Sequence, residues 1–598
     1  MLKQQTKLFN VRALAFPTNC LENIDKWMLS VFQKKASPYG AEDTQSVGSS
    51  EQQMYNIAHR GQQLVNIFLQ FANIPAFYAE KNIQIQITED NESLAIALPV
   101  PLIEMVSEKA YEIAIQSAFS LLTWMVKNEV SIENTKRVHN TVEKKIRIPM
   151  KNFYVGGKST LRILQAANDE NIPFIHLGYG IYQLGWGGKS HQLNVTGSEQ
   201  DSITGVVAAQ DKVRSAKLLH MYGLPAPQQI IVNSKETATN RVKELGWPVV
   251  VKPINCDRGE GVVIGIKNNR TLSKAFEHAK KFSPGAPIIL EKEVAGVCHR
   301  IFIVNGSLLY VSKRWPISVI GDGQQTVSQL IASNNAIENE KPPWLRSPEY
   351  PADLFATEIM KADGFSLEII PAKNQRVQLR PFESNEWGGS SEDVTNQVHP
   401  ANLALALKAA KAFGLCNVGI DLISTDISVP WYKNDAVINE VNFSPELGSN
   451  SASLSCIPSF INNLIKGDGR IPIEVFVGGN DALKQAKGKH QDYLSSGINN
   501  CLTTANLTLY LSEGELHMPL NSALERCRAL LLDKKVEAIV LVLQTDEYLM
   551  GIHPFDQISS LTEVDNKLTS WKNSGEKIAT KRHDVLCEKL KERLSTIN

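Results

Sequence analysis

The sequence predicts a multidomain protein in which an N-terminal α+β region precedes α/β regions. Three observations lead to this fold class. The chain has 598 residues, too many for one hydrophobic core. Residues 1–155 mix long apolar helical stretches with an alternating strand. From about residue 160, short β-branched strands alternate with helices, which is typical of α/β folds.

Composition excludes several classes of protein. The 62 basic and 62 acidic residues cancel, so no general charge footprint for nucleic acid or an anionic membrane is present. No apolar run approaches the roughly 18 residues of a spanning helix, and the N-terminus does not resemble a signal peptide. The eight cysteines are scattered without a C-x-x-C pair, which argues against zinc and disulfides. We therefore expect a cytoplasmic protein without nucleic-acid or membrane partners.

In the N-terminal region, residues 1–155, we expect helices over 54–72 and 110–128 and a strand within 81–90. Residues 36–52, rich in Ser, Gly and Gln, are predicted to form a mobile loop. No combination of residues in this region indicates catalysis.

The middle region, residues 156–468, and the C-terminal region, residues 469–598, show the α/β alternation. The strands expected in the middle region cover 229–233, 248–254, 262–266, 287–294, 300–306, 307–314, 419–424 and 436–442. The helices expected there cover 211–222, 235–245, 270–281 and 402–413. In the C-terminal region we expect strands within 469–479, 507–511 and 536–544, a helix over 522–533 and a charged helical tail.

The first chemical feature is the segment PVVVKPINCDRGEGV, residues 248–262. A strand carries Lys252 into a loop with Gly259 and Gly261, and a second strand follows. A lysine can neutralise phosphate oxygens, and glycines let backbone N–H groups approach them closely. The same pattern also occurs in an ordinary β-hairpin.

The second feature is the strand IILEKEVAG, which carries Glu291 and Glu293. The edge of such a strand can bind adenine, and a carboxylate can hold a ribose hydroxyl. An apolar strand that runs into a polar turn is the simpler alternative.

The third feature is a pair of strands with Asp421 on one and Glu440 and Asn442 on the other. The spacing of two places Glu440 and Asn442 on the same face of their strand. Oxygen-bearing side chains gathered beside an apolar sheet are costly without a cation, and carboxylate and amide oxygens suit magnesium. The alternative is that these residues cap strand ends in water.

The fourth feature is a set of basic residues, each of which could also be a solvated surface charge. Arginine forks match carboxylates and transferring phosphoryl groups. The set consists of Lys212, Arg300, Lys313 and Arg314, followed by the stretch at 379–400.

The order of these motifs resembles the ATP-grasp superfamily, and specifically the cyanophycin synthetases. The resemblance implies an ATP-grasp fold that binds ATP and magnesium, with two ions. It implies Lys212, Lys252, Arg258, Gly259, Gly261, Glu291 and Glu293 for the nucleotide, Asp421, Glu440 and Asn442 for the metal, and Arg300, Arg314 and Lys252 for catalysis. The phrases that carry the resemblance are YQLGWGGKS (182–190), DKVRSAKLLHMYGLPAPQ (211–228), PVVVKPINCDRGEGV, EKEVAGVCHRIFIVNGSLLYVSKRWPISVIGDG (291–323), WGGSSEDVTNQVHP, GIDLISTDIS and NEVNFSPEL.

Departures from the family pattern occur where substrate is expected. The usual NHGRG loop is replaced by residues 257–261, with Arg258 in place of a histidine. Cys298 replaces an acidic residue, and His191 and Gln192 replace a basic pair. The aspartate substrate of the family is therefore not assumed for this chain.

The C-terminal region resembles the entry to a Mur-ligase-like domain that has lost its phosphate loop. The loop's lysine aligns with Ala482, its preceding glycine with Asp481, and a magnesium-binding glutamate with Val542. The stretch at 487–490 has no Walker-loop spacing, and the chain stops at Asn598, short of a full Mur ligase. We therefore expect a truncated, degenerate α/β remnant.

The resemblance implies a ligase that joins an amino-acid or peptide carboxylate to an amino acid through an acyl phosphate, releasing ADP and phosphate. The alternatives are repeated addition to a polymer, as cyanophycin synthetases perform, and a non-catalytic assembly subunit. The implied partners are amino-acid and peptide-like substrates. A homo-oligomer, dimer or tetramer, is also expected.

Overall fold

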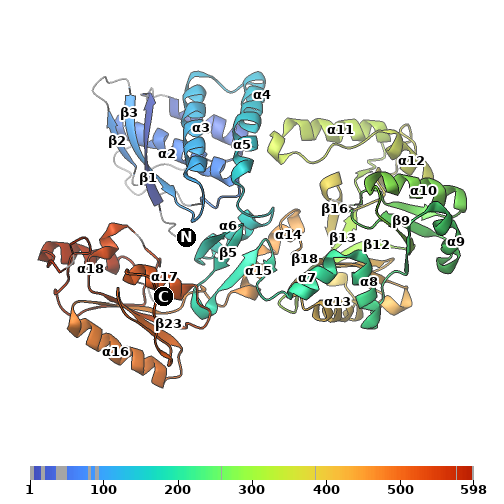
Figure 1. The fold of residues 1–598 in the computed structure, drawn as a ribbon. Coiled ribbons are helices and arrows are strands. Elements are labelled where there is room, and N and C mark those ends of the chain that lie inside the picture. Colours follow the sequence, from blue (N-terminus) through green and yellow to red (C-terminus); the bar gives the residue numbers. More distant parts are fainter. Residues whose placement is uncertain are drawn as a thin grey trace.

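The computed structural model describes residues 6–14, 20–35, 50–77, 83–87, 93–256, 259–383, 385–551, 553–573 and 575–594. Figure 1 shows an N-terminal body at the upper left, a C-terminal body at the lower left and a larger body on the right, with residues around α6 and β5 between them. Among the described residues, no helix is long and apolar enough to span a membrane.

The N-terminal body packs helices against a three-stranded antiparallel sheet of order β1-β3-β2. Its core draws on buried residues between Ala13 and Val155. The two helices and the strand expected here are present. Of the predicted loop at 36–52, residues 36–49 lie outside the described residues, while residues 50–52 begin α2 instead. The elements are β1 (Thr6–Leu14), α1 (Leu21–Phe32), α2 (Ser50–Gln70), β2 (Gln84–Ile87), β3 (Ser93–Pro101), α3 (Glu108–Lys127), α4 (Ile132–Thr141) and α5 (Ile148–Met150).

A small antiparallel sheet, of order β4-β5-β6-β7, joins the bodies. Its buried side chains pack against α15 and the central sheet of the larger body. Toward the C-terminal body, the Gln183 amide donates to the Leu531 carbonyl at 3.0 Å, and the Trp186 N–H donates to the Gly469 carbonyl at 2.8 Å. The elements are α6 (Thr160–Asp169), β4 (Phe174–Gly178), β5 (Ile181–Leu184), β6 (His191–Asn194) and β7 (Gly197–Ser198).

The larger body contains two antiparallel sheets, one of four strands (β10-β9-β11-β8) and one of five (β16-β13-β12-β17-β18). The four-stranded sheet is covered by α9 and α10, which form its core with the buried strands. All eight strands and four helices expected from the sequence are present. The elements are α7 (Ile203–Gln210), α8 (Lys212–Met221), β8 (Gln229–Val232), α9 (Lys235–Leu245), β9 (Val249–Pro253), β10 (Val263–Ile266), α10 (Asn269–Phe282), β11 (Ile288–Lys292), β12 (Val297–Val304), β13 (Ser307–Trp315), β16 (Ser390–Asp393), α13 (Pro400–Phe413), β17 (Asn417–Ser424), β18 (Val437–Phe443), α14 (Ser451–Ser455) and α15 (Ile457–Leu464).

Local sequence explains these boundaries. The Ser234 hydroxyl accepts from the Thr237 N–H and so caps the start of α9, and the helix ends where Gly246 takes a positive φ of 69°. Strand β9 is buried along its whole length because it lies between β10 and β11. Its β-branched valines suit this position. The lysine at its end is thereby held in a fixed position.

An insertion between β13 and β16 forms its own small core around the β14–β15 pair. Trp344 of this insertion packs into the N-terminal body, with ring centroids 6.0 Å from Phe32, 5.5 Å from Phe71 and 5.7 Å from His139. Figure 1 shows α11 reaching toward that body. The insertion comprises β14 (Ser318–Ile320), α11 (Val327–Glu340), α12 (Leu354–Ala362) and β15 (Arg376–Gln378).

The C-terminal body is built on a six-stranded sheet of order β22-β21-β20-β23-β19-β24, parallel at its centre. The expected strands and the expected helices over 522–533 and at the tail are present, and α16 covers residues 487–490, so this stretch is no loop. The domain boundaries at 155 and 468 remain predictions. The elements are β19 (Ile473–Val477), α16 (Asn480–Ser495), β20 (Asn500–Thr503), β21 (Thr508–Tyr510), β22 (Gly514–Glu515), α17 (Ala523–Leu531), β23 (Ala538–Leu543), β24 (Ser560–Glu563) and α18 (Thr580–Lys591).

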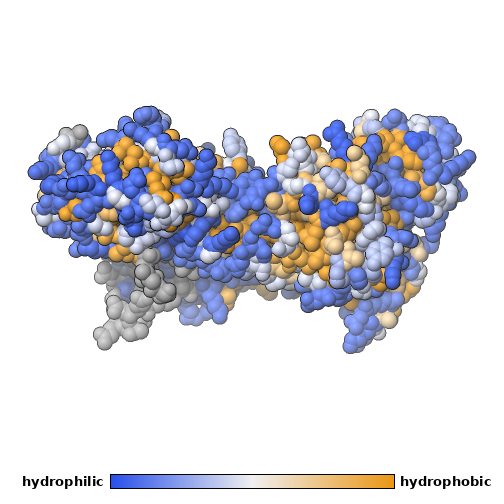
Figure 2. Space-filling view, turned by 90° about the horizontal axis from the view of Figure 1, so that it is seen from below, coloured by the Kyte–Doolittle hydropathy of each residue, from blue (hydrophilic) through white to orange (hydrophobic). Residues whose placement is uncertain are grey.

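One surface feature is set by α7, a helix composed largely of apolar residues. Its Ile203 side chain is 78% exposed, and Val207 is also exposed. Figure 2, which views the molecule from below, shows apolar residues gathered to the right of the middle of that face and a second group on the left.

Candidate active site

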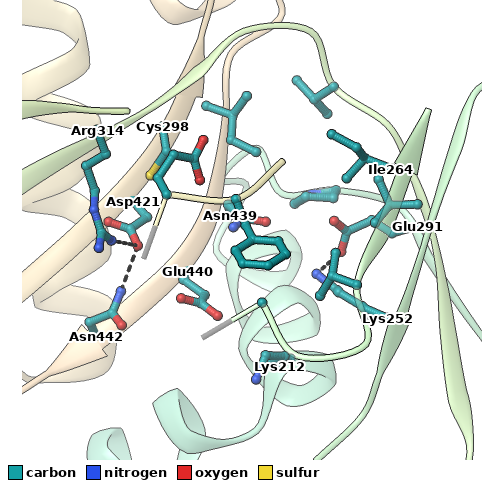
Figure 3. A pocket seen from close by; sticks show the side chains of 18 of the residues that line it. Lys212, Lys252, Ile264, Glu291, Cys298, Arg314, Asp421, Asn439, Glu440 and Asn442 are labelled. Carbon is teal, nitrogen blue, oxygen red and sulfur yellow. Dashed lines mark hydrogen bonds and ion pairs between the residues drawn. The ribbon is translucent and has the colours of Figure 1, made fainter. Parts of the chain in front are cut away.

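A cleft of about 810 Å³ lies between the two sheets of the larger body. One wall comes from β9 and β11, and the other from β12, β13, β17 and β18. Residues 381–383, which follow β15, complete the lining. Figure 3 shows Lys252 and Glu291 on one side of the cleft, Arg314, Asp421 and Asn442 on the opposite side, and Glu440 between them.

The side of the cleft formed by β9 and β11 contains a buried ion pair. The Lys252 Nζ lies 2.5 Å from the Glu291 carboxylate, which also accepts from the Gln229 amide at 2.7 Å. Strand pairing fixes this contact, because Lys252 lies opposite Ile289 and Glu291 opposite Val250. The pair keeps a lysine charge inside the cleft at a site where an isolated charge would be costly.

Lys212, the first residue of α8, also lines the cleft, and its Nζ donates to the Cys256 carbonyl at 2.8 Å. This contact joins α8 to the segment that enters the glycine loop. Glu293 accepts from the Gly265 N–H at 2.8 Å, so its carboxylate holds the β10 edge next to the same loop. The two predicted lysines and two predicted glutamates therefore line one cleft.

The glycines of the loop are required by its backbone. Gly259 has a φ of +82° and Gly261 a φ of +69°, the left-handed region that residues with a Cβ rarely adopt. A Cβ at Gly259 would lie 2.7 Å from the Phe382 ring. Arg258, which the sequence assigned to this loop, lies outside the described residues.

The opposite side of the cleft centres on Asp421, whose side chain is almost wholly buried. Arg300 forms a two-pronged ion pair with it, in which Nη2 donates to Oδ2 at 2.7 Å and Nε donates to Oδ1. The Arg314 Nη1 lies 3.7 Å from Oδ2, and the Asn442 amide donates to Oδ2 at 3.2 Å. Glu440 lies directly opposite Asp421 in the strand pair.

Burial and charge act differently on the two acids. Burial raises the pKa of Asp421, but the charge and hydrogen bonds of Arg300 outweigh it, so the pKa lies below the ordinary value. Burial raises the pKa of Glu440, and the charge of Asp421 raises it further, against the lowering effect of Lys212 and Lys252. Asp421 is thus stabilised as an anion by the protein itself, whereas Glu440 is not.

Two observations show that the acidic set fits a cation. Glu440 has no ion-pair partner among the described residues, although it lies beside a second carboxylate. The Asn442 amide nitrogen is used by Asp421, so its oxygen remains as an acceptor. Within the described ranges, no group of three or more His, Cys, Asp or Glu side chains is placed to hold a metal, so the candidate set is two carboxylates and one amide.

Lys313 is not part of the cleft. Its Nζ lies 4.5 Å from the centroid of the Trp315 ring, and it is absent from the cleft lining. Alternation along β13 explains this, since Arg314 points to the cleft and its neighbour to the other face. Of the basic residues that the sequence analysis grouped, Arg314 therefore lines the cleft and Lys313 does not.

Sequence reasoning assigned no role to several residues that line the cleft, among them Phe382, Glu383 and Asn439. Phe382 and Glu383 lie in the stretch at 379–400, but nothing in its local pattern assigns a role to either. Cys298, noted only as a departure, also lines the cleft, and burial raises the pKa of its thiol well above the usual value. Cys298 and Glu383 lie near Arg314 and Asp421, whereas Phe382 packs against Gly259 of the glycine loop.

The turn from β19 to α16, where the sequence suggested a former phosphate loop, consists of Gly478 and Gly479. The Gly479 N–H donates to the Asp565 carboxylate at 3.0 Å. Ala482 and Val542 are both fully buried in one apolar cluster. The positions aligned with the lysine and the glutamate, on α16 and β23, are therefore apolar and buried.

Residues 209–308 match the family model of the RimK-like ATP-grasp domain. The chain is 29% identical to the cyanophycin synthetase of Trichormus variabilis over 395 residues, which cover 64% of this chain and 44% of that protein. It is 30% identical over 285 residues to the glutathione biosynthesis bifunctional protein GshAB of Mannheimia succiniciproducens, covering 46% and 36%. The chain thus spans less than half the length of these relatives.

Among solved structures, the bifunctional glutathione synthetase from Pasteurella multocida gives a TM-score of 0.39 at 17% identity, covering 70% of this chain and 79% of that one. The D-alanine–D-alanine ligase from Bacillus anthracis complexed with ATP gives 0.27 at 15% identity, covering 45% and 69%. The family match and the curated relatives confirm the ATP-grasp fold and the similarity to cyanophycin synthetases that the sequence indicated.

Proposed function

We propose that the chain is an ATP-dependent carboxylate–amine ligase, which joins an amino-acid or peptide carboxylate to an amino acid and releases ADP and phosphate. One observation carries the proposal. A single cleft holds lysines at one side, an arginine–carboxylate cluster at the other and an unpaired carboxylate between them. The similarity to cyanophycin synthetase and GshAB supports the same class of reaction.

The proposed roles of the residues follow from their positions in the cleft. Lys212, Lys252 and the loop at Gly259 and Gly261 hold the nucleotide phosphates, and Glu291 and Glu293 hold the nucleoside. A substrate carboxylate oxygen attacks the γ-phosphorus, the bond to the β–γ bridging oxygen breaks, and an acyl phosphate and ADP result. Positioning and electrostatic stabilisation account for most catalysis of this kind.

Arg300 and Arg314 stabilise the negative charge that develops at the substrate side of the cleft. The amine, once it has lost a proton, attacks the acyl carbon through its nitrogen, phosphate leaves with the electron pair of the C–O bond, and the nitrogen releases a second proton to solvent as the amide forms. Asp421, Glu440 and Asn442 would hold magnesium, which neutralises phosphate charge when bound. Two ions are proposed from the family resemblance.

The C-terminal body is proposed to be a degenerate, non-catalytic Mur-ligase-like remnant with a packing role. Its support is the apolar filling around Ala482 and Val542 and the contacts to residues 183–186. We propose the same division as the sequence did, with domains at 1–155, 156–468 and 469–598.

The direct test is ADP release measured against a panel of L-amino acids and dipeptides, as single compounds and in pairs, with Mg²⁺ and ATP. We expect ADP release that depends on both a carboxylate donor and an amine. Mass spectrometry of the product separates a single ligation from repeated addition. Confirmed ATP binding with no amine-dependent turnover across the panel would contradict the ligase and favour a non-catalytic assembly subunit.

A homo-oligomer, dimer or tetramer, is part of the proposal. The family resemblance supports it, and the exposed Ile203 and Val207 of α7 offer an apolar contact. Light scattering after size exclusion should give a mass of two or four chains. A single-chain mass over the micromolar range would contradict this part of the proposal.

A further inference from the structure

Glu383 is a carboxylate at the substrate side of the cleft that the proposed roles leave unused. It lies in the segment after β15 and lines the cleft with Cys298 of β12 and Arg314 of β13. The charged side chains that act on it are Arg314 and Asp421. Asp421 also acts on Glu440, which is in addition influenced by Lys212, Lys252 and Arg300. Both unpaired carboxylates therefore lie near Asp421, but Glu440 lies on the side of the lysines and Glu383 on the side of Arg314.

Glu383 has no cationic partner among the described residues. No lysine, arginine or histidine nitrogen of these residues lies within 4.0 Å of its carboxylate. Arg300 is held by both oxygens of Asp421, and Arg314 is also directed to Asp421, at 3.7 Å. Burial raises the pKa of the Glu383 carboxyl, against the lowering effect of Arg314. Removal of a carboxylate from water without a counterion is costly.

The chemistry of the proposed reaction supplies a cation at this place. An aliphatic amine arrives at neutral pH as an ammonium group, whose N–H groups are donors without an acceptor. The nitrogen must approach the acyl carbon next to Arg300 and Arg314, which is the side of the cleft where Glu383 lies. Charge-assisted hydrogen bonds to a carboxylate both attract and orient such a group.

We propose that Glu383 binds the ammonium group of the amine substrate and positions its nitrogen beside the acyl phosphate. This inference rests on the proposed ligase function and assigns a substrate-binding residue to it. It predicts selection for substrates with a free, protonated amine. Phe382, which packs against Gly259, links this residue to the glycine loop, so the amine and phosphate sites share one segment.

The test compares Glu383→Gln with the matched variant Glu386→Gln, which removes a carboxylate from the same segment. Glu386 pairs with Lys158 at 2.9 Å and does not line the cleft. The probe is the L-amino acid that gives the fastest ADP release in the panel. In Glu383→Gln, its KM should rise by about tenfold or more, with the KM for ATP unchanged. Glu386→Gln should leave both values unchanged.

Hydroxylamine separates amine binding from acyl phosphate formation, because it is uncharged at neutral pH. Glu383→Gln should form hydroxamate from the carboxylate donor at the wild-type rate. Loss of hydroxamate together with ligation, or an unchanged KM for the amino acid, would overturn the inference. Absence of hydroxamate and of amine-dependent ADP release in the wild type would instead overturn the ligase function.

A second measurement needs only the wild-type protein. Two analogues of the same amino acid serve as competitive inhibitors, one with a dimethylammonium group, which keeps the charge and one N–H donor, and one with a hydroxyl in place of the amine. The cationic analogue should bind about tenfold more tightly or better. Equal inhibition by both analogues would overturn the inference even if Glu383→Gln failed to fold.

Discussion

In both the ATP-grasp cleft and the β19–α16 turn, a strand is followed by glycines. The side chains buried next to these glycines are charged in the cleft and apolar at the turn. In the cleft, Lys252, Glu291 and Asp421 are buried as ion pairs. At the turn, Ala482 and Val542 are buried among apolar side chains.

The difference between charged and apolar burial indicates that the cleft binds a ligand and that the cluster beside the turn only stabilises the fold. Buried ion pairs stabilise a fold little, because desolvation offsets much of the attraction. Their presence in the cleft is therefore better explained by a ligand than by folding. The apolar cluster beneath α16 stabilises the C-terminal body directly, and the Gly479 N–H is satisfied within the protein by Asp565.

The largest expected effect is on turnover. Glu440→Gln should lower amine-dependent ADP release by a factor on the order of 100 or more, because it removes the unpaired carboxylate of the proposed metal set. Burial beside Asp421 raises the pKa of Glu440, so the charged form is disfavoured in the ligand-free protein. The thermal midpoint without ligand should therefore be retained or raised. The assay is ADP release alongside thermal denaturation.

Lys484→Ala is the control for this prediction, since Lys484 is exposed on α16. It should leave turnover unchanged. ADP release that is equally unaffected by both changes would not come from this cleft and would favour an assembly subunit over an enzyme.

The next effect concerns stability. Ala482→Lys places a charge in a fully buried apolar cluster and should destabilise the C-terminal body by about 3 kcal/mol or more, followed by denaturant unfolding. Gly488→Lys adds a lysine to an exposed, open position of the same helix and should cost little. A functional phosphate loop would accept the lysine at residue 482, so unchanged stability would contradict the remnant hypothesis.

The smallest effect is expected at the glycine loop. Gly259→Ala and Gly285→Ala impose the same backbone strain, since φ is +82° and +79°, and each should cost about 1–2 kcal/mol. The methyl group of Gly259→Ala would lie 2.7 Å from the Phe382 ring, whereas that of Gly285→Ala would have no neighbour within 4 Å. The KM for ATP should rise several-fold in Gly259→Ala and remain unchanged in Gly285→Ala. An equal change in both would show that strain alone, and not the cleft, is responsible.

Much of the fold was predictable because the strands of the ATP-grasp part are short, β-branched and separated by clear turn residues. The spacing of two predicted that Glu440 and Asn442 share a face, and strand pairing adds that Asp421 lies opposite Glu440. The place of Glu383 in the cleft lining was not predictable, because its loop reaches the cleft through tertiary packing of the insertion. The contact of Trp344 with Phe32 and Phe71 likewise joins residues about 300 positions apart, which no local pattern encodes.

Calorimetric titration with a non-hydrolysable ATP analogue and Mg²⁺ tests the central claim most directly, namely that nucleotide binds in the ATP-grasp cleft alone. The account predicts one site per chain, lost in Lys252→Met and unchanged in Lys484→Ala. Two sites per chain, or binding that survives Lys252→Met, would contradict it.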